Sequence, residues 1–155
     1  PGVGGHCIAV DPWFIVAKTP EQARLIRTAR EVNDAKPEWV IDQVKIKIAD
    51  FLQANPNKTI QDVTIACYGL AFKPDIDDLR ESPALEITKK LADQGFNILV
   101  IEPNIDTLPR DMPENTKLIE IENKDDADIH VVLVAHREFK TISIKSEYIL
   151  NTVGI

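Results

Sequence analysis

The sequence has few cysteines, no excess of positive charge and no long apolar run. Its two cysteines, Cys7 and Cys67, lie far apart among 155 residues, which does not fit the disulfide framework of a small secreted domain. The net charge of −7, without any Lys/Arg cluster, argues against nonspecific binding to nucleic acid or to an anionic membrane surface. No apolar run is long enough to span a membrane. We expect a cytoplasmic globular protein with one sizeable core, or one domain plus a helical appendage.

Three of the six glycines lie in the first five residues, within the stretch Pro1-Gly2-Val3-Gly4-Gly5-His6-Cys7. Such a loop accepts positive φ and lets a ligand approach main-chain N–H groups. A potential nucleophile, Cys7, follows directly, and Asp11 would share its face on one helical turn. No His or Asn partner can be placed from sequence, so an ordinary turn with a small buried cysteine remains an alternative.

The region from Thr19 to Ala54 has the apolar periodicity of a helix. Thr19-Pro20-Glu21-Gln22 predicts its start, with Thr19 as cap and Pro20 in the first turn. Pro37 predicts two nearly continuous helices rather than one. Their apolar stripe cannot be buried by the pair alone, so we expect it to pack on another domain or a second subunit. The stripe comprises Ile26, Ala29, Asn33, Val40, Val44, Ile48, Phe51 and Leu52.

The second half alternates short apolar runs with a helical pattern. A strand at Val63–Tyr68, a helix capped by Ser82 and ended near Gly95, and a strand at Asn97–Ile101 form a βαβ unit, which implies a parallel sheet. Further strands are expected near residues 117–121, 129–135 and 152–155. The predicted fold is α/β: residues 1–57 hold an active-site loop and a long central helix or helix pair, and residues 58–155 form a doubly wound, mainly parallel, Rossmann-like sheet domain.

Two motifs carry a family resemblance. Gly2-Val3-Gly4-Gly5-His6-Cys7-Ile8-Ala9-Val10-Asp11-Pro12 and the stretch from Gly69 to Ala84, Gly-Leu-Ala-Phe-Lys-Pro-Asp-Ile-Asp-Asp-Leu-Arg-Glu-Ser-Pro-Ala, resemble the UDP-glucose/GDP-mannose dehydrogenase family of NAD-dependent nucleotide-sugar 6-dehydrogenases. The UDP-glucose branch typically has Ser and Lys where this chain has His6 and Val10. Together with Trp13-Phe14-Ile15 and the run from Ala23 to Val44, this favours the branch acting on UDP-N-acetyl-D-mannosamine.

The resemblance implies that the chain is the C-terminal part of a longer enzyme. Family members carry an N-terminal Rossmann domain that holds NAD, with catalytic Lys and Asn residues, and nothing here corresponds to it. They use a long central helix as the link between domains and as the core of a homodimer. One departure concerns the last residues, because Asn151 stands where the family usually has Asp, which puts complete nucleotide binding in doubt.

The resemblance also implies roles for single residues. The expected site comprises Cys7 and Asp11 as catalytic residues, Gly4, Gly5, His6, Phe72 and Lys73 as UDP-sugar contacts, and Arg80 as an NAD contact. Lys73 could instead be a solvated surface lysine, and Arg80 could serve only an ion pair with Asp77, Asp78 or Glu81. No cluster has zinc spacing, so no metal is expected.

Four other polar residues receive weaker assignments. Cys67 lies in an apolar strand, so we expect a buried thiol with a raised pKa and no catalytic role. His130 and His136 flank a strand, and a strand-end hydrogen bond is the expected role of His136. Glu102 ends the second strand and only weakly suggests a ribose contact.

The activity implied by the resemblance is oxidation of the sugar C6 alcohol to a carboxylate in two hydride transfers to NAD. Cys7 would form a thiohemiacetal and then a thioester, which water hydrolyses with help from Asp11. Alternatives are the same chemistry on UDP-N-acetylglucosamine, UDP-glucose or GDP-mannose. In isolation, the chain is expected to be a non-catalytic UDP-sugar-binding and dimerisation module. An independent cysteine hydrolase would need a histidine near Cys7.

Overall fold

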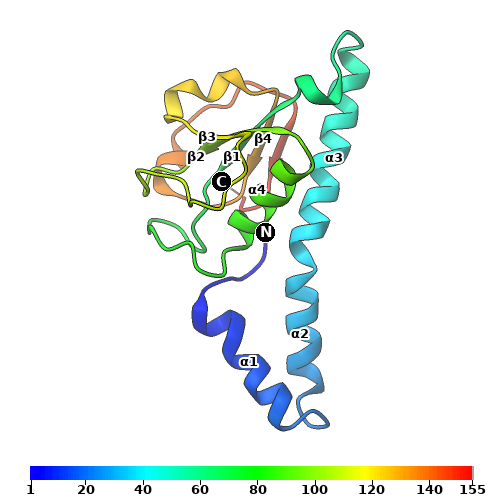
Figure 1. Ribbon diagram of the computed structural model, residues 1–155, viewed down its shortest axis with the longest axis vertical. Coiled ribbons are helices and arrows are strands. Elements are labelled where there is room, and N and C mark those ends of the chain that lie inside the picture. Colours follow the sequence, from blue (N-terminus) through cyan, green and yellow to red (C-terminus); the bar gives the residue numbers. More distant parts are fainter. Residues whose placement is uncertain (155) are drawn as a thin grey trace.

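Two nearly continuous helices form the spine of the molecule (Figure 1). The computed structural model describes residues 1–154, in which helix α2, Arg24–Asp34, is separated from helix α3, Lys36–Ala54, by Ala35 alone. Pro37 lies in the first turn of α3, where its missing N–H leaves no hydrogen bond unmade. The prediction of two nearly continuous helices is confirmed.

Helix α1, His6–Lys18, packs against α2 to form a helical arm below the rest of the molecule (Figure 1). The expected active-site loop is therefore short, because the helix already begins at His6. The predicted helix start at Thr19 is wrong. Thr19 ends α1, since its N–H and its Oγ1 both donate to the carbonyl of Ile15, at 2.9 and 3.0 Å. Pro20 explains this, because the residue before a proline is disfavoured in helical conformation.

The remaining chain forms a sheet of five parallel strands in the order β3-β2-β1-β4-β5. The order reverses between β1 and β4, which is the doubly wound pattern expected from the sequence, and ligands in such sheets bind beyond the carboxyl ends of the strands at that point. The strands are β1 Thr64–Tyr68, β2 Asn97–Ile101, β3 Thr116–Leu118, β4 Ile129–Val132 and β5 Ile149–Asn151.

Helices cover the sheet unequally. Helices α3 and α4, Pro83–Asp93, contribute to the larger hydrophobic core together with residues from β1, β2 and β4. A smaller core contains Tyr68 and Phe139. Two short 3₁₀ helices, η2, Ile121–Asp126, and η3, Arg137–Lys140, contribute side chains to it. A third 3₁₀ helix, η1, Ile60–Asp62, links α3 to β1. Among residues 1–154, no helix has both the length and the apolar character needed to cross a membrane.

The apolar stripe of α3 is buried by the chain itself. Val40, Val44, Ile48 and Phe51 belong to the larger core, which confirms that the stripe packs on another part of the structure. The α2 members of the stripe are only half-buried or exposed, and one of them, Asn33, has a polar role described below.

The local signals around α4 are confirmed. Ser82 caps the helix by accepting a hydrogen bond from the N–H of Leu85, and Gly95 follows the helix with a φ of 93°. The thiol of Cys67 is buried in β1, and burial raises its pKa to about 12, as expected for a cysteine without a catalytic role.

The predicted last strand at residues 152–155 is wrong for its described part. The strand lies earlier, at Ile149–Asn151, and the side-chain oxygen of Asn151 accepts hydrogen bonds from the N–H groups of Val153 and Gly154. These bonds turn the chain, so pairing stops there. Ile155 lies outside the described residues.

Candidate functional site

Two segments far apart in sequence meet beside the carboxyl end of β1. The segment before α1 contains Gly4, at which a Cβ atom would lie 2.1 Å from the carbonyl oxygen of Glu81. The N–H of Gly5 donates to the same carbonyl at 3.3 Å. A Cβ at Gly5 would come within 3.0 Å of the Phe72 ring. The structure thus brings together Gly4, Gly5 and Phe72; space requires glycine at position 4, and a φ of 100° favours it at position 5.

Asn33 of α2 fixes the same segment from the other side. Its side-chain oxygen accepts the N–H of Val3 at 2.7 Å, and its side-chain nitrogen donates to the carbonyl of Val3 at 3.0 Å. The helical spacing predicts Asn33 as a member of the apolar stripe, so this hydrogen-bonding role was not predicted. Asn33 is the one polar residue in that stripe, and this is the sequence feature that could have indicated the role. The segment before Cys7 is therefore held by the arm and by the α/β domain together.

Cys7 and Asp11 lie in the first two turns of α1, four residues apart, so they share one face of the helix. Cys7 is an exposed free thiol at the second residue of the helix. The N–H groups of a first helical turn have no partner within the helix, so they are available to a ligand. His6, the first residue of α1, is exposed as well.

Arg80 forms an ion pair with Asp78, the alternative to the NAD contact implied by the resemblance. Its Nε donates to both carboxylate oxygens at 3.0 and 3.1 Å, and its Nη2 donates to one of them at 2.7 Å. These bonds lower the pKa of Asp78 to about 2 and raise the pKa of Arg80.

Lys73, in the loop after β1, is exposed and forms no ion pair with the described residues. Its ammonium lies 5.7 Å from the centroid of the Phe72 ring. A cavity of about 170 Å³ adjoins it, lined by Gly2, Phe72, Lys73 and Pro83 together with residues after β4. This volume is below the roughly 300–1,000 Å³ of ordinary ligand clefts, so the cavity by itself does not define a nucleotide site.

The loop after β1 is tied to the neighbouring strand ends by buried polar groups. The Glu102 carboxylate, which directly follows β2, accepts the N–H groups of Leu70 and Ala71 at 2.7 and 3.1 Å. It also contacts Nε2 of His136 at 3.0 Å. Burial alone would raise the pKa of Glu102, but these hydrogen bonds outweigh it and lower the pKa to about 2. Glu102 therefore holds the loop, a role different from the ribose contact that its position weakly suggested.

Asp75, His136 and Glu138 place three potential metal-ligand atoms within 4.8 Å of one another, a cluster that no spacing rule predicted. The ring nitrogen Nδ1 of His136 accepts the N–H of Asp75 at 2.9 Å, and Nε2 faces Glu102. A carboxylate oxygen of Asp75 accepts the N–H of Arg137 at 2.9 Å. A metal ion would have to displace main-chain hydrogen bonds, so the cluster is better described as structural.

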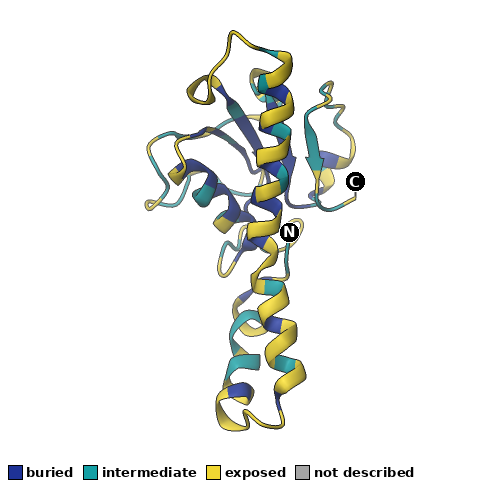
Figure 2. Ribbon diagram, turned by 90° about the vertical axis from the view of Figure 1, so that its right-hand side faces the viewer, coloured by how far each residue is buried: buried dark blue, intermediate teal, exposed yellow. Residues whose placement is uncertain are grey.

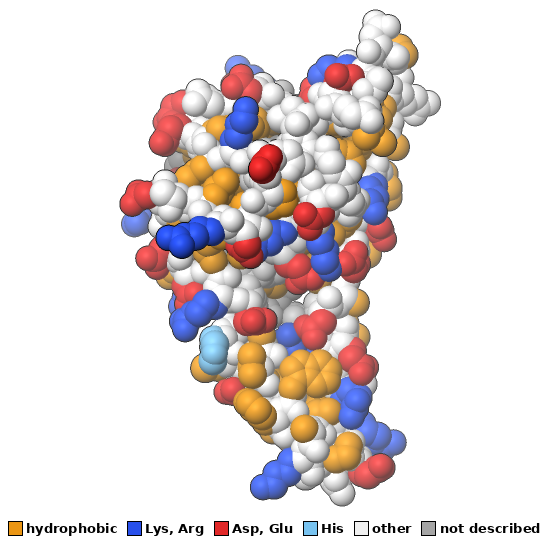
Figure 3. All heavy atoms as spheres, viewed as in Figure 1, with side chains coloured by type: hydrophobic (Ala, Val, Ile, Leu, Met, Phe, Trp, Pro, Cys, Tyr) orange, Lys and Arg blue, Asp and Glu red, His pale blue; other side chains and the backbone are white. Residues whose placement is uncertain are grey.

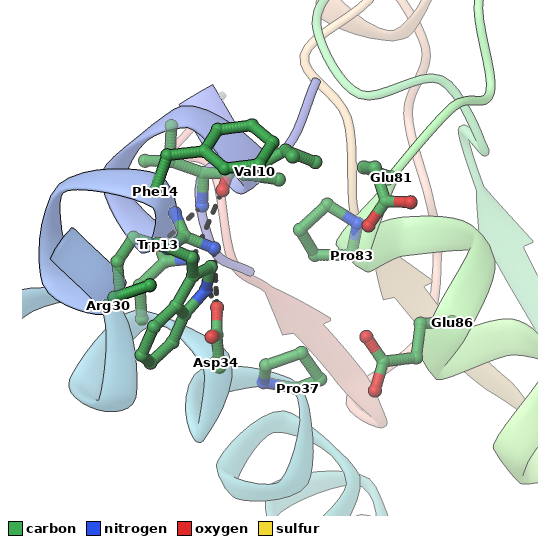
Figure 4. A pocket seen from close by; sticks show the side chains of 13 residues that line it. Val10, Trp13, Phe14, Arg30, Asp34, Pro37, Glu81, Pro83 and Glu86 are labelled. Atoms are coloured by element: carbon green, nitrogen blue, oxygen red, sulfur yellow. Dashed lines mark hydrogen bonds and ion pairs between the residues drawn. The ribbon is translucent and has the colours of Figure 1, made fainter. Parts of the chain in front are cut away.

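A larger cleft of about 590 Å³ separates the helical arm from α4 (Figure 4). Trp13 and Phe14 of α1 line one side, and Glu81, Pro83 and Glu86 line the other. Neither Cys7 nor Lys73 lines this cleft, but Glu81 and Pro83 border both the cleft and the segment before α1. In the view of Figure 3, apolar side chains gather over the helical arm.

Comparisons with known proteins agree with the geometry. Residues 66–153 match the family model described as UDP-glucose/GDP-mannose dehydrogenase family, UDP binding domain. A UDP-N-acetyl-D-mannosamine dehydrogenase from Escherichia coli is 54% identical over 160 residues, which cover 100% of this chain and 38% of that protein. Its counterpart from Campylobacter jejuni is 52% identical over 154 residues, covering 97% of this chain and 35% of that protein.

Solved structures show the same fold. A UDP-N-acetyl-mannosamine dehydrogenase from S. aureus has a TM-score of 0.67 at 35% identity, covering 96% of this chain and 32% of that one. A UDP-glucose dehydrogenase from Pyrobaculum islandicum has a TM-score of 0.82, 17% identity and coverage of 97% and 34%, which supports the fold alone. The chain spans 38% of the length of the first curated relatives that it matches.

Proposed function

Because the chain belongs to the UDP-glucose/GDP-mannose dehydrogenase family, we propose that it supplies the nucleophile and the UDP-sugar half-site of a UDP-N-acetyl-D-mannosamine 6-dehydrogenase. The observation that carries this proposal is the meeting of the segment before Cys7 with Phe72 and Glu81 of the loop after β1. The choice of sugar is supported by the 54% identity to a UDP-N-acetyl-D-mannosamine dehydrogenase over the whole chain. UDP-N-acetylglucosamine and UDP-glucose remain the alternative substrates.

Cys7 would act in the second of two oxidations at C6. Its thiolate sulfur forms a bond to the carbon of the C6 aldehyde, and the aldehyde oxygen takes up a proton to give a thiohemiacetal. Loss of hydride from that carbon, together with loss of the hydroxyl proton, leaves a thioester. Water then breaks the carbon–sulfur bond, which releases the carboxylate and returns the thiol. Asp11, one helical turn away, would accept the proton of the attacking water.

NAD would supply the hydride acceptor when bound. The described residues would contact only part of a bound NAD, because the loop after β1 lacks the Gly-x-Gly-x-x-Gly motif of a dinucleotide-binding site. Arg80 suits a contact with a cofactor phosphate, since its side chain is 69% exposed and Asp78 fixes its direction. The main NAD site would belong to a part of the enzyme outside this chain, and this chain alone would bind UDP-sugar without turnover.

We propose that the enzyme works in the cytoplasm, where the exposed thiol of Cys7 would stay reduced.

The alternative of an independent cysteine hydrolase loses support, because His130 and His136 are buried and form hydrogen bonds within the α/β domain.

Lys73 provides the direct test of the half-site. We expect the chain to bind UDP weakly, and Lys73→Ala to weaken that binding about tenfold, because a desolvated ammonium facing a pyrophosphate contributes about 1.4 kcal/mol or more. Isothermal titration calorimetry with UDP-N-acetylmannosamine and UDP measures it. Lys117→Ala, which removes an exposed lysine from β3, should bind like the unmodified chain. Equal affinity in both variants, or tight binding of NAD by the chain, would refute the assignment.

A homodimer through the central helices is the second part of the proposal. Four large apolar side chains recur every seven residues along α2 and α3: Leu25, Val32, Trp39 and Ile46, exposed by 82, 68, 48 and 53%. We call them the heptad row. Figure 2 shows that the outward side of these helices is largely exposed. A seven-residue apolar repeat is the pattern of a helix that packs along another helix, so a second copy is the proposed partner.

A charge in the middle of the heptad row should separate the copies. We expect the unmodified chain to sediment as a dimer and Val32→Glu to sediment as a monomer, because a carboxylate buried between two apolar helices has no partner. Sedimentation velocity at several concentrations measures the change. Ile60→Glu is the matched control, since Ile60 is an apolar residue 50% exposed outside the row. A monomeric unmodified chain, or a dimeric Val32→Glu variant, would contradict the proposal.

A further inference from the structure

Five hydrogen-bond contacts converge on the buried carboxylate of Glu102. One oxygen accepts the N–H groups of Leu70 and Ala71 and faces Nε2 of His136. The other accepts the main-chain and side-chain N–H groups of Asn104, both at 3.1 Å. Glu102 is 4% exposed. An ionised carboxylate only accepts hydrogen bonds, whereas the amide of glutamine would turn two N–H groups of its own toward some of these donors.

His136 extends this hydrogen-bond network to Asp75, in the middle of the loop after β1. Because the N–H of Asp75 donates to Nδ1, Nδ1 is the acceptor of the ring and Nε2 is the nitrogen that donates to Glu102. The ring is 0% exposed and packs edge-on against Phe139, with ring centroids 5.3 Å apart. The side chain of Asp75 in turn accepts the N–H of Arg137.

The first half of the loop is thus fixed on both sides of Phe72 and Lys73 by one buried pair. Glu102 holds Leu70 and Ala71 before them, and His136 holds Asp75 after them. Asp75 has a φ of 62°, a left-handed conformation that is unfavourable for a residue with a side chain and persists only where surrounding contacts impose it. Phe72 and Lys73 lie between these two fixed points and make no such buried contact.

We propose that Glu102 and His136 are a positioning pair that sets the place of Lys73 for the phosphates of the nucleotide sugar. The inference rests on the proposed function of the loop. Neither residue needs to touch the ligand. Glu102 follows β2 and His136 follows β4, the strands on either side of β1, so the pair ties three strand ends to one ligand loop.

The test is a double-substitution experiment on this chain with UDP as the probe. We expect His136→Ala and Glu102→Gln each to weaken UDP binding about tenfold by calorimetry. In the Lys73→Ala background the same substitutions should have little further effect, because residues that act through one group are not additive. A loss of general stability would instead weaken binding equally in both backgrounds.

The matched control is His130→Ala. His130 is also buried, and its Nδ1 lies 2.8 Å from the hydroxyl of Tyr68, but it belongs to β4 itself and makes no contact with the loop. Its loss should lower the melting temperature and leave the UDP affinity of the folded chain unchanged. Amide hydrogen exchange at Leu70, Ala71 and Asp75 should accelerate in His136→Ala and stay slow in His130→Ala.

The outcomes separate this inference from the proposed function. Absence of UDP binding by the unmodified chain would overturn the proposed function, and this inference with it. UDP binding that needs Lys73 but survives His136→Ala would overturn the positioning pair alone. Equal effects of His136→Ala with and without Lys73 would also overturn it. If Glu102→Gln does not fold, His136→Ala and the exchange of the Asp75 amide still decide the result.

Discussion

Replacing Cys7 by serine in the full-length enzyme is expected to lower formation of the uronic acid by about 10⁶-fold, the order of loss seen when the nucleophile of a serine protease is removed. A hydroxyl is not ionised near neutral pH, and without an addition to C6 the aldehyde has no intermediate from which a second hydride can leave. Oxidation of the alcohol to the aldehyde requires no such bond. NADH released per sugar should therefore fall from two towards one, measured by absorbance and by mass spectrometry of the sugar product.

The control for this substitution is Cys67→Ala. Cys67 is a buried thiol of β1 with a pKa raised to about 12, so it takes no part in covalent chemistry. Its replacement should lower stability and leave two NADH per sugar. Full activity of Cys7→Ser, or selective loss of the second oxidation in Cys67→Ala, would rule out the proposed role of Cys7.

Gly4→Ala should lower the free energy of unfolding by about 3 kcal/mol, the upper range for forced overpacking. The added Cβ would meet the carbonyl oxygen of Glu81 at 2.1 Å and Cδ of Pro83 at 2.5 Å. Neither is the end of a flexible side chain, so the segment before α1 must move away from the α/β domain. Urea unfolding measures the loss, and displacement of α1 should also weaken any ligand contact made near Cys7.

Gly95→Ala separates crowding from backbone strain. Gly95 has a φ of 93°, and nothing lies within 4 Å of an added Cβ atom. Only the left-handed conformation is then penalised, by about 1–2 kcal/mol. A Gly4→Ala variant no less stable than the unmodified chain would show that the contact with Glu81 does not hold the segment in solution.

Much of the α/β domain could be predicted because its signals are local. Ser82 followed by proline fixes the start of α4, and a glycine fixes its end. Short β-branched runs separated by a helix leave few alternatives to parallel pairing. Thr19 was misread because a threonine beside a proline can close the preceding helix as well as cap the following one, and only the backbone conformation decides.

The candidate site was predicted unevenly for a different reason. Its two motifs were recognised through the family resemblance, and the structure adds that Gly4, Gly5 and Phe72 are close in space. The supporting residues could not be predicted. Asn33 acts on Val3, 30 positions away, and Glu102 acts on Leu70, 32 positions away. No local pattern encodes contacts over such distances along the chain.

The heptad row has a geometric consequence for the proposed dimer. An α-helix has 3.6 residues per turn, so positions seven apart drift by about 20° around its axis. Leu25 and Ile46 are three such intervals apart, and the row therefore winds by about 60° around the spine formed by α2 and α3. Two parallel straight rods could not keep such rows in register. The spines of two copies must therefore cross obliquely or coil around each other with a left-handed twist.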